Sequence, residues 1–130
     1  MGPSQGDNMA GVLVDSCGWA ALMESGLNID TAMRDVVGNP EFFLLERVLE
    51  ELNELALEKR GLLLKLLVAR STIIENPEGL RHTDDMLLQL SKENRWAVLT
   101  VDTRLKERLA MSGCGYIEVV SGRMLRFIGP

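Results

Sequence analysis

The segment AVLTVDTRLKERL, residues 97–109, decides the fold of this chain. It begins as a short apolar run, typical of a buried strand, which ends at Asp102. A helix is predicted directly afterwards, from Thr103 to Met111. An earlier segment, GVLVDSCGWAALM (residues 11–23), has the same order, with a buried strand that ends at Asp15 and a short helix that follows. Two strands that each lead through an aspartate into a helix indicate a parallel sheet whose strands are joined by helices.

The remainder of the chain continues this alternation of apolar runs and helical patterns. Strands are expected at 11–14, 41–45, 72–74, 96–101, 116–120 and 124–128, and helices at 19–23, 31–37, 46–58, 60–71, 83–94 and 103–111. Asp30 is predicted to cap the second of these helices and Gly38 to end it. The polar residues 1–9 predict a disordered leader. Residues 10–130 predict one domain with a three-layer α/β/α fold, in which helices cover both faces of a central parallel sheet.

Composition excludes several classes of protein. With 130 residues, 46% of them hydrophobic and 25% charged, the chain is long enough to bury a core without disulfides or a structural metal. Cys17 and Cys114 lack the spacing of a zinc site, so a reduced, cytoplasmic setting is expected. No segment is long and apolar enough to predict a membrane span. The net charge of −5 argues against a protein that mainly coats nucleic acid, but not against an enzyme that acts on it.

The two strand-end aspartates are the first candidates for a functional site. In an open parallel sheet, ligands bind beyond the carboxyl ends of the strands, at the point where the strand order reverses. If the strands that lead to Asp15 and Asp102 are neighbours at that point, both carboxylates lie in one crevice. A single aspartate after a strand is more often a helix N-cap than a catalyst. An aspartate after each of the two most convincing predicted strands favours a shared site.

Helical geometry adds a glutamate. With about 100° per residue, the helix 46–58 has an apolar stripe, made of Val48, Leu49, Leu52, Leu55 and Ala56. Glu46, Glu50 and Glu54 point away from this stripe and are expected to be solvated. Glu51 lies at the edge of this stripe, so it is either a solvated charge or a residue of the functional site.

The helix 83–94 adds an aspartate. Asp84 lies between Leu87 and Leu88 on the helical wheel, hence on the buried face, whereas Asp85 lies at the margin of the polar face. A carboxylate is rarely buried without a partner. Asp84 is therefore predicted either to cap its own helix or to face a cation.

Four carboxylates in one crevice would repel one another unless a divalent cation neutralised them. Carboxylate oxygens suit Mg²⁺ or Mn²⁺, and the natural chemistry of such a site is hydrolysis of a phosphodiester. No serine or cysteine has the sequence surroundings of a nucleophilic triad. The one histidine, His82, precedes a helix and is expected to be a cap or a surface residue.

The order of the motifs VLVDSCGW, RVLEELNEL, HTDDMLLQLS and AVLTVDTRLKERL resembles the PIN domain of archaeal and bacterial nucleases. The resemblance covers nearly the whole chain, from Val12 to Ile128, and includes the last two strands. Thr100-Val-Asp102 is its most specific piece. The chain looks especially similar to PIN proteins related to the ribosomal RNA processing factor Fcf and to archaeal VapC-type toxins.

This resemblance implies a metal-dependent endoribonuclease that uses Mg²⁺ or Mn²⁺. It assigns the catalytic and metal-binding roles to Asp15, Glu51, Asp84 and Asp102, with assistance from Asp85. Ser16 and Thr100 would be supporting hydroxyls. Cys17 departs from the family pattern, in which a small polar residue is common. A PIN fold that binds RNA or protein and cuts poorly or not at all is the alternative, because fold alone does not establish activity.

The resemblance also implies partners. RNA is the expected substrate, and Arg60, Arg104 and Arg108 are the best candidates to contact its phosphates, whereas Lys59 is more readily a solvated surface charge. An antitoxin protein is the partner if the chain is a toxin. The helix 60–71 carries more leucines than one buried stripe requires, namely Leu62, Leu63, Leu64, Leu66 and Leu67. Burial on two sides within the domain and a homodimer contact both explain this excess.

Overall fold

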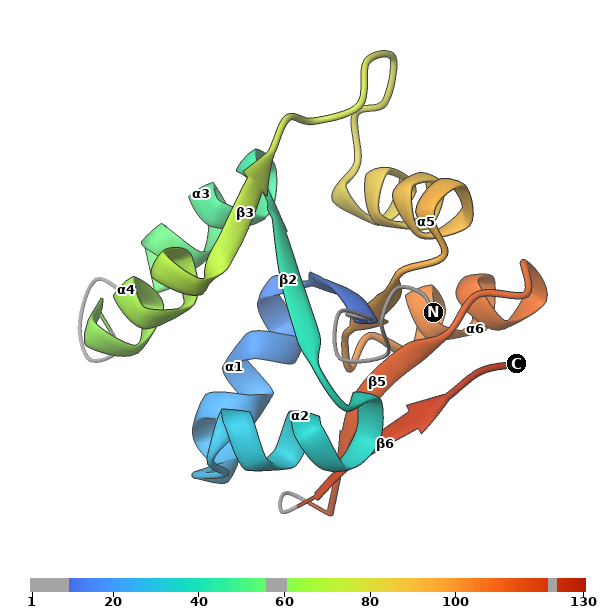
Figure 1. Ribbon diagram of the computed structural model, residues 1–130. Helices are drawn as coiled ribbons and strands as arrows, with labels where there is room; N and C mark the ends of the chain where they lie inside the picture. Colours follow the sequence, from blue (N-terminus) through green and yellow to red (C-terminus); the bar gives the residue numbers. More distant parts are fainter. Residues whose placement is uncertain (1–9, 56–60, 122–123) are drawn as a thin grey trace, which may run out of the picture.

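A six-stranded sheet forms the middle layer of the computed structural model, which describes residues 10–55, 61–121 and 124–130 (Figure 1). The strand order is β3-β2-β1-β4-β5-β6. The strands are β1 (Ala10–Val14), β2 (Pro40–Leu45), β3 (Ser71–Ile74), β4 (Ala97–Leu99), β5 (Tyr116–Val120) and β6 (Met124–Ile128). All neighbouring strands are parallel except β5 and β6, which form an antiparallel hairpin. The predicted mainly parallel central sheet is therefore confirmed.

In the described part of the chain, six helices cover the two faces of this sheet. They are α1 (Ser16–Ser25), α2 (Ile29–Val37), α3 (Glu46–Leu55), α4 (Gly61–Arg70), α5 (Thr83–Asn94) and α6 (Thr103–Met111). The first four lie on one face, and α5 and α6 pack together on the other (Figure 1). The described helices agree with the three-layer α/β/α prediction. No helix in the described ranges is long and apolar enough to cross a membrane.

The strands that precede the two predicted acids are neighbours. Val12 pairs with Ala97 and Val14 with Leu99, in parallel register. From β1 the chain continues into a helix on one face, and from β4 into a helix on the other face. The strand order therefore reverses between β1 and β4, which is where ligands bind in open parallel sheets.

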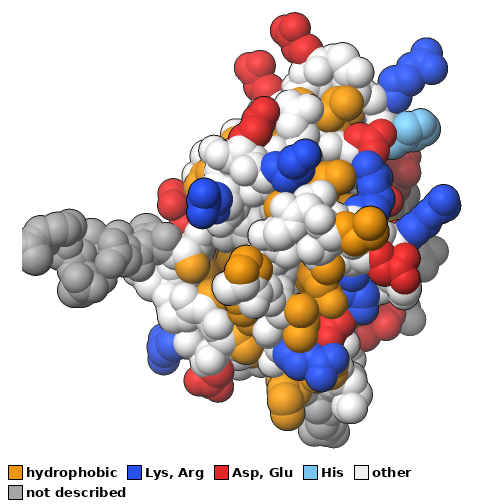
Figure 2. Space-filling view, turned by 90° about the vertical axis from the view of Figure 1, so that its right-hand side faces the viewer, with side chains coloured by type: hydrophobic (Ala, Val, Ile, Leu, Met, Phe, Trp, Pro, Cys, Tyr) orange, Lys and Arg blue, Asp and Glu red, His pale blue; other side chains and the backbone are white. Residues whose placement is uncertain are grey.

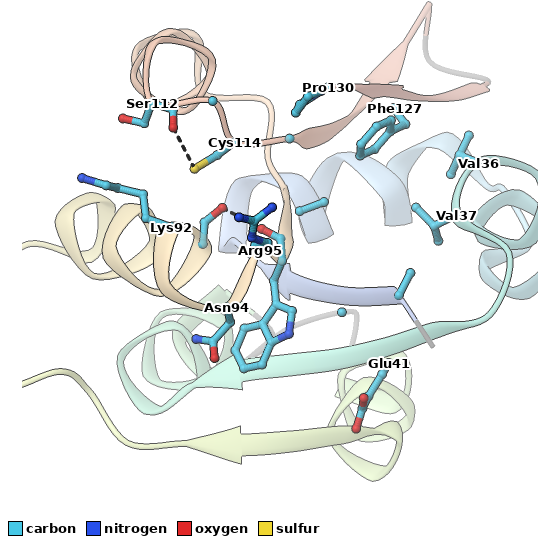
Figure 3. Close-up of a pocket in the computed structure, with 17 residues that line it drawn as sticks. Val36, Val37, Glu41, Lys92, Asn94, Arg95, Ser112, Cys114, Phe127 and Pro130 are labelled. Atoms are coloured by element: carbon cyan, nitrogen blue, oxygen red, sulfur yellow. Dashed lines mark hydrogen bonds between the residues drawn. The ribbon is translucent and has the colours of Figure 1, made fainter. Parts of the chain in front are cut away.

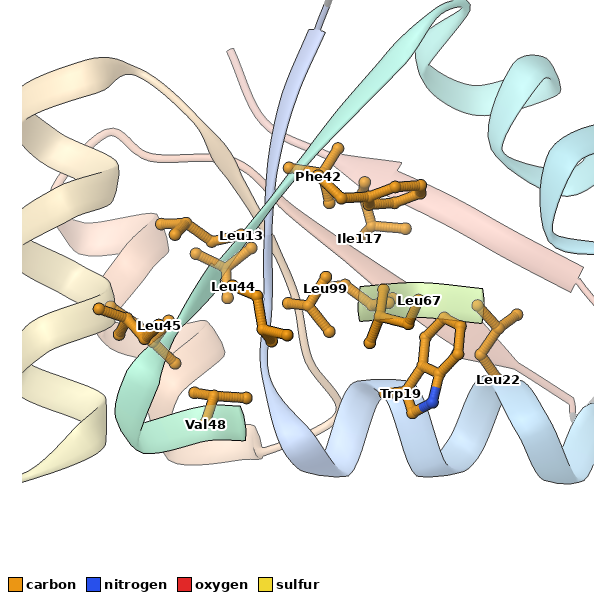
Figure 4. Packing of buried hydrophobic residues seen from close by; sticks show 14 of the residues in the cluster. Leu13, Trp19, Leu22, Phe42, Leu44, Leu45, Val48, Leu67, Leu99 and Ile117 are labelled. Carbon is orange, nitrogen blue, oxygen red and sulfur yellow. The ribbon is translucent and has the colours of Figure 1, made fainter. Parts of the chain in front are cut away.

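Apolar side chains on both faces of the central strands form the core (Figure 4). Leu13 and Leu99 are fully buried, and Trp19 from α1 packs in the same cluster. Close packing of α1 depends on Gly18, because a Cβ atom there would lie 2.3 Å from the carbonyl oxygen of Leu99. This contact sets the start of α1, and with it Asp15, against the carboxyl end of β4.

Two local predictions were wrong. The N-cap of α2 is Asn28, whose Oδ1 accepts a hydrogen bond from the backbone N–H of Thr31 at 3.0 Å, and Asp30 instead forms an ion pair with Arg70. Asp30 lies two residues beyond the capping position, because the helix begins at Ile29. Leu55 was assigned to the buried stripe of its helix, yet it is 63% exposed at the last position of α3. The apolar stripe of α3 is thus exposed to solvent at the end of the helix.

Candidate active site

Asp15 lies at the carboxyl end of β1 and is only 6% exposed. It caps α1 by accepting a hydrogen bond from the backbone N–H of Ser16 at 2.9 Å. Its Oδ2 accepts a hydrogen bond from the Thr100 hydroxyl at 2.7 Å and another from the Cys17 thiol at 3.2 Å. Burial raises the pKa of Asp15, the three hydrogen bonds partly offset that rise, and the nearby charge of Glu51 adds to it. The carboxylate is thus both a cap and a buried group that forms no ion pair with any cation of the described residues.

The Thr100 hydroxyl joins the two strand ends. It is fully buried, donates to Asp15 and accepts the backbone N–H of Asp102 at 3.1 Å. Asp102 in turn caps α6, since its Oδ1 accepts the N–H of Leu105 at 2.9 Å. Thr100 therefore fixes the positions of both aspartates relative to each other, as the expectation of a supporting hydroxyl requires.

Glu51 reaches the same edge of the sheet from α3. Its Oε1 accepts a hydrogen bond from the Ser16 hydroxyl at 2.9 Å, and its Oε2 accepts one from the Thr83 hydroxyl at 2.7 Å. These bonds connect α3 to the first residues of α1 and α5. They exclude the interpretation of Glu51 as a solvated surface charge. Thr83 is a site residue that sequence reasoning missed. Its only signal was a hydroxyl at the start of a helix, which is usually a capping signal.

Asp84 is half-buried in the first turn of α5. Its pKa is raised, first by burial and then by the negative charges of Asp102 and Asp15. Arg108 lowers the pKa, and Asp85 raises it further. The mutual repulsion means that three carboxylates from different elements share one region. Like charges raise one another's pKa only when they are close.

A cavity of about 500 Å³ opens beside these acids. It is lined by His82, Thr83, Asp84, Asp85, Arg104 and Arg108. Within it, Arg108 donates to Asp85 at 2.8 Å. Figure 2 shows this part of the surface around its single histidine, where basic and acidic side chains alternate. His82 itself is exposed and makes no side-chain capping bond, as expected of a surface residue.

Not every predicted site residue lies at this edge of the described structure. Arg60 and Lys59 lie outside the described residues, so their predicted phosphate contacts stay predictions. Arg104 is exposed at the cavity, and Arg108 is ion-paired there. Four elements therefore supply the acids Asp15, Glu51, Asp84 and Asp102, while Asp85 is already engaged by an arginine.

The donor set of this edge consists of carboxylate and hydroxyl oxygens, which Mg²⁺ and Mn²⁺ prefer. Within the described ranges, no three acidic, cysteine or histidine side chains are grouped closely enough to hold a metal ion by themselves. Mg²⁺ is commonly held by one or two carboxylates with water and substrate phosphate completing its shell. The chemistry of the donors therefore fits such an ion.

A second, larger cavity of about 810 Å³ lies at the opposite edge of the sheet (Figure 3). Ala10 and Gly11 at the start of β1 and Ala97 at the start of β4 line it, together with Trp96. Glu41 is the one acid among its lining residues. Among the described residues, this edge therefore lacks the concentration of carboxylates that marks the candidate active site.

Comparison with solved structures identified similar chains, among them the PIN domain endonuclease Utp24, with a TM-score of 0.77. The match covers 92% of each chain. This chain has the PIN-domain fold. Sequence identity to that endonuclease is 16%, so the likeness establishes the fold alone. Neither the protein-family models nor the curated proteins gave a match. The predicted PIN-like fold is confirmed, while the closer resemblance to Fcf-related and VapC-type proteins stays a prediction.

Proposed function

We propose that this protein is a metal-dependent endoribonuclease, a hydrolase that cuts phosphodiester bonds within RNA. The observation that carries the proposal is that the Thr100 hydroxyl joins Asp15 and Asp102 at the point where the strand order reverses, with Asp84 close enough for both charges to raise its pKa. No described cation forms an ion pair with any of these three carboxylates. A fold that gathers such charges without neutralising them favours an external cation.

In this proposal Asp15, Glu51, Asp84 and Asp102 hold Mg²⁺ or Mn²⁺. The bound ion would lower the pKa of a water ligand and neutralise charge on the phosphate. Thr100 would keep Asp15 ionisable and oriented by donating to its Oδ2. Ser16 and Thr83 would hold Glu51 in place between two helices. The site gains its rigidity from three helix starts and two strand ends.

RNA is the proposed substrate, acted on in the cytoplasm, where the two free cysteines would stay reduced. Arg104 and Arg108 line the cavity next to the acids, which supports the proposal that they contact phosphates. The biological role is either RNA processing or that of a VapC-type toxin with an antitoxin partner. Both roles need the same chemistry at the same edge.

A second candidate function is an RNA- or protein-binding PIN module with weak or no cleavage. One observation favours it: both oxygens of Glu51 accept hydroxyl hydrogen bonds. A metal ion that used Glu51 would have to share it with these donors. The two candidates differ in a single measurable property, which is metal-dependent cleavage.

Cleavage of a labelled, unstructured single-stranded RNA tests the proposal. We expect cutting with Mg²⁺ or Mn²⁺, none in EDTA, and a rate at least about 100-fold lower in Asp15→Asn. Asp30→Asn is the matched control, because Asp30 is an exposed aspartate that lines a cavity with Pro40 at the start of β2. Full activity in Asp15→Asn, or no cleavage by the folded wild-type protein with either metal, would contradict an active nuclease.

We further propose that α4 contributes to a homodimer contact. Leu64 and Leu67 are buried, whereas Leu63 and Leu66, one turn apart, are 40% and 52% exposed. Leu62 belongs to the same predicted surface, but its side chain lies outside the description. Light scattering at tens of micromolar should give the mass of a dimer, and Leu66→Glu should give that of a monomer. A monomeric wild-type mass contradicts this contact.

A further inference from the structure

The Asp85–Arg108 ion pair separates two neighbouring cavities between α5 and α6. The first is the cavity beside the acids, which includes Asp84. The second, of about 410 Å³, is lined by Leu80, Asp85, Leu88, Gln89, Lys92, Glu93 and Arg108. Both cavities include Asp85 and Arg108, so they adjoin at this pair. Together they form what we call the α5–α6 groove, which leads away from the acidic edge.

Arg108 keeps most of its binding capacity in this groove. Its Nη2 donates to Asp85 Oδ1 at 2.8 Å, and its side chain is 42% exposed. A guanidinium has five N–H donors, and that of Arg108 makes no other hydrogen bond or ion pair with a described residue. It is also close enough to the acidic edge to lower the pKa of Asp84. An anion in the groove would therefore meet a charged donor that is already oriented.

The lining of the groove suits a single nucleic-acid strand. Arg104, Arg108 and Lys92 supply positive charge along it beside the acids Asp84, Asp85 and Glu93. The partly buried Leu80 and Leu88 supply apolar surface. Single-stranded nucleic acid is generally bound by positive charge along the backbone together with surfaces that accept the faces of the bases. Continuity with the acidic edge and the exposed guanidinium of Arg108 thus favour the same occupant.

The Asp85 side chain is poorly placed to bind the same metal ion as Asp84. Consecutive residues of an α-helix point about 100° apart. One oxygen of Asp85 is already occupied by a guanidinium, which is the partner that a carboxylate binds in preference to water. Removing Asp85 would release Arg108 into solvent, because no other described residue holds it.

We propose that the α5–α6 groove binds the RNA strand beyond the phosphate that is cut, and that Asp85 is a positioning residue. Asp85 holds Arg108 where a backbone phosphate passes, and it does not bind the metal. This inference rests on the proposed function for the identity of the strand. The binding itself can be measured without any cleavage.

Fluorescence anisotropy with a labelled 12-nucleotide oligouridylate in EDTA tests the groove. We expect Arg108→Ala to weaken binding roughly three- to tenfold and to reduce the slope of log affinity against log salt by about 0.7, as for one lost phosphate contact. Asp85→Asn should weaken binding by about two- to fourfold, because Arg108 loses its orientation. If Asp85 were only a nearby negative charge, its removal would strengthen binding, which is the opposite sign.

A double-mutant cycle shows whether Asp85 acts through Arg108. In the Arg108→Ala background, Asp85→Asn should cause no further loss. Asp30→Asn is the matched control, since it breaks another aspartate–arginine pair outside the groove and should leave RNA affinity unchanged. Unchanged or stronger binding in Asp85→Asn, or an equal loss in both backgrounds, overturns the positioning role.

Thermal unfolding with and without Mg²⁺ separates this role from that of a metal ligand. The rise in melting temperature on adding Mg²⁺ should persist in Asp85→Asn, and its loss would overturn the inference. A wild-type protein that binds RNA through Arg108 but never cuts it contradicts the proposed nuclease and leaves the groove intact. Cleavage by the wild type with unchanged RNA affinity in Arg108→Ala contradicts the groove alone.

Discussion

Asp15 and Glu118 are equally buried carboxylates with opposite surroundings. Each is 6% exposed. Glu118, in β5, accepts hydrogen bonds from Lys106 at 2.8 Å and from the Arg126 Nε at 2.9 Å, so two cations neutralise it. Asp15 has a hydroxyl, a thiol and a backbone N–H as donors, and its electrostatic neighbours are acids. Lysine and arginine lower the pKa of Glu118, whereas burial raises that of Asp15.

The difference is the one expected between a carboxylate that serves the fold and one that, as we propose for Asp15, binds a ligand. Burial of a charge is costly unless a partner compensates for it. For Glu118 the chain itself supplies that partner from α6 and β6. For Asp15 the chain supplies hydrogen bonds but no opposite charge, and it adds further acids nearby. An external cation would complete the arrangement at Asp15 and is not needed at Glu118.

The largest expected contrast is in the response to metal. Mg²⁺ or Mn²⁺ should raise the melting temperature of the wild-type protein, because the ion relieves repulsion in the folded state only. Asp15→Asn should abolish this rise yet leave the metal-free protein as stable as the wild type or more so. Glu118→Gln replaces an equally buried carboxylate and should retain the full rise in melting temperature. Unfolding of metal-free Asp15→Asn would instead make Asp15 a structural cap.

A smaller effect is expected on stability at neutral pH. Here the change at Glu118, and not the change at Asp15, should destabilise the protein. Glu118→Gln should lose about 1–3 kcal/mol of unfolding free energy, because two charge-assisted hydrogen bonds weaken. The folded-state pKa of Glu118 is lowered, so its contribution is present above the unfolded pKa and is lost as the pH falls through the folded pKa. Urea unfolding at pH 7 and in acid should show the two proteins converging as the pH falls. A constant difference would argue against the ion pairs.

The smallest effect concerns the hydrogen bond from Thr100. Thr100→Val removes a donor that lowers the pKa of Asp15, and it also removes the acceptor for the Asp102 N–H. The pKa of Asp15 should rise further, so the acidic limb of the pH–rate profile should move to higher pH. Stability should fall by about 1 kcal/mol. Thr72→Val, an exposed threonine in β3, is the control. An unmoved acidic limb would mean that Thr100 does not tune Asp15.

Much of the fold could be predicted because its signals are local. A buried strand followed by an aspartate and a helix occurs twice, and the hydrophobic period distinguishes strand from helix within a few residues. The same period placed Glu51 at a stripe edge and Glu50 on the solvated side. In the structure Glu51 lies among the other acids and Glu50 is exposed. A helical wheel suffices here because the side of a helix that faces the sheet is set by its own apolar residues.

Where sequence reasoning failed, a distant segment decided the outcome. Asp30 and Asn28 are both acceptable caps, and the structure uses Asn28 while Arg70 from α4 engages Asp30. The expected metal role of Asp85 stays a prediction, and the partner that the structure gives this carboxylate, Arg108, comes from the distant helix α6. The partner of a charged side chain depends on which elements pack beside it, and a single segment does not contain that information.

By itself the sequence determined the alternation of strands and helices, the two aspartates at strand ends and the acidic faces of two helices. Only the tertiary structure decided which donors hold each carboxylate. Thr100 reaches Asp15 across 85 positions of the chain, and Thr83 reaches Glu51 across 32. Hydrogen bonds act over about 3 Å and need alignment, so these contacts exist only after the helices have packed on the sheet. The sequence therefore predicts which acids are candidates, while the fold decides which hydrogen-bond donors hold them.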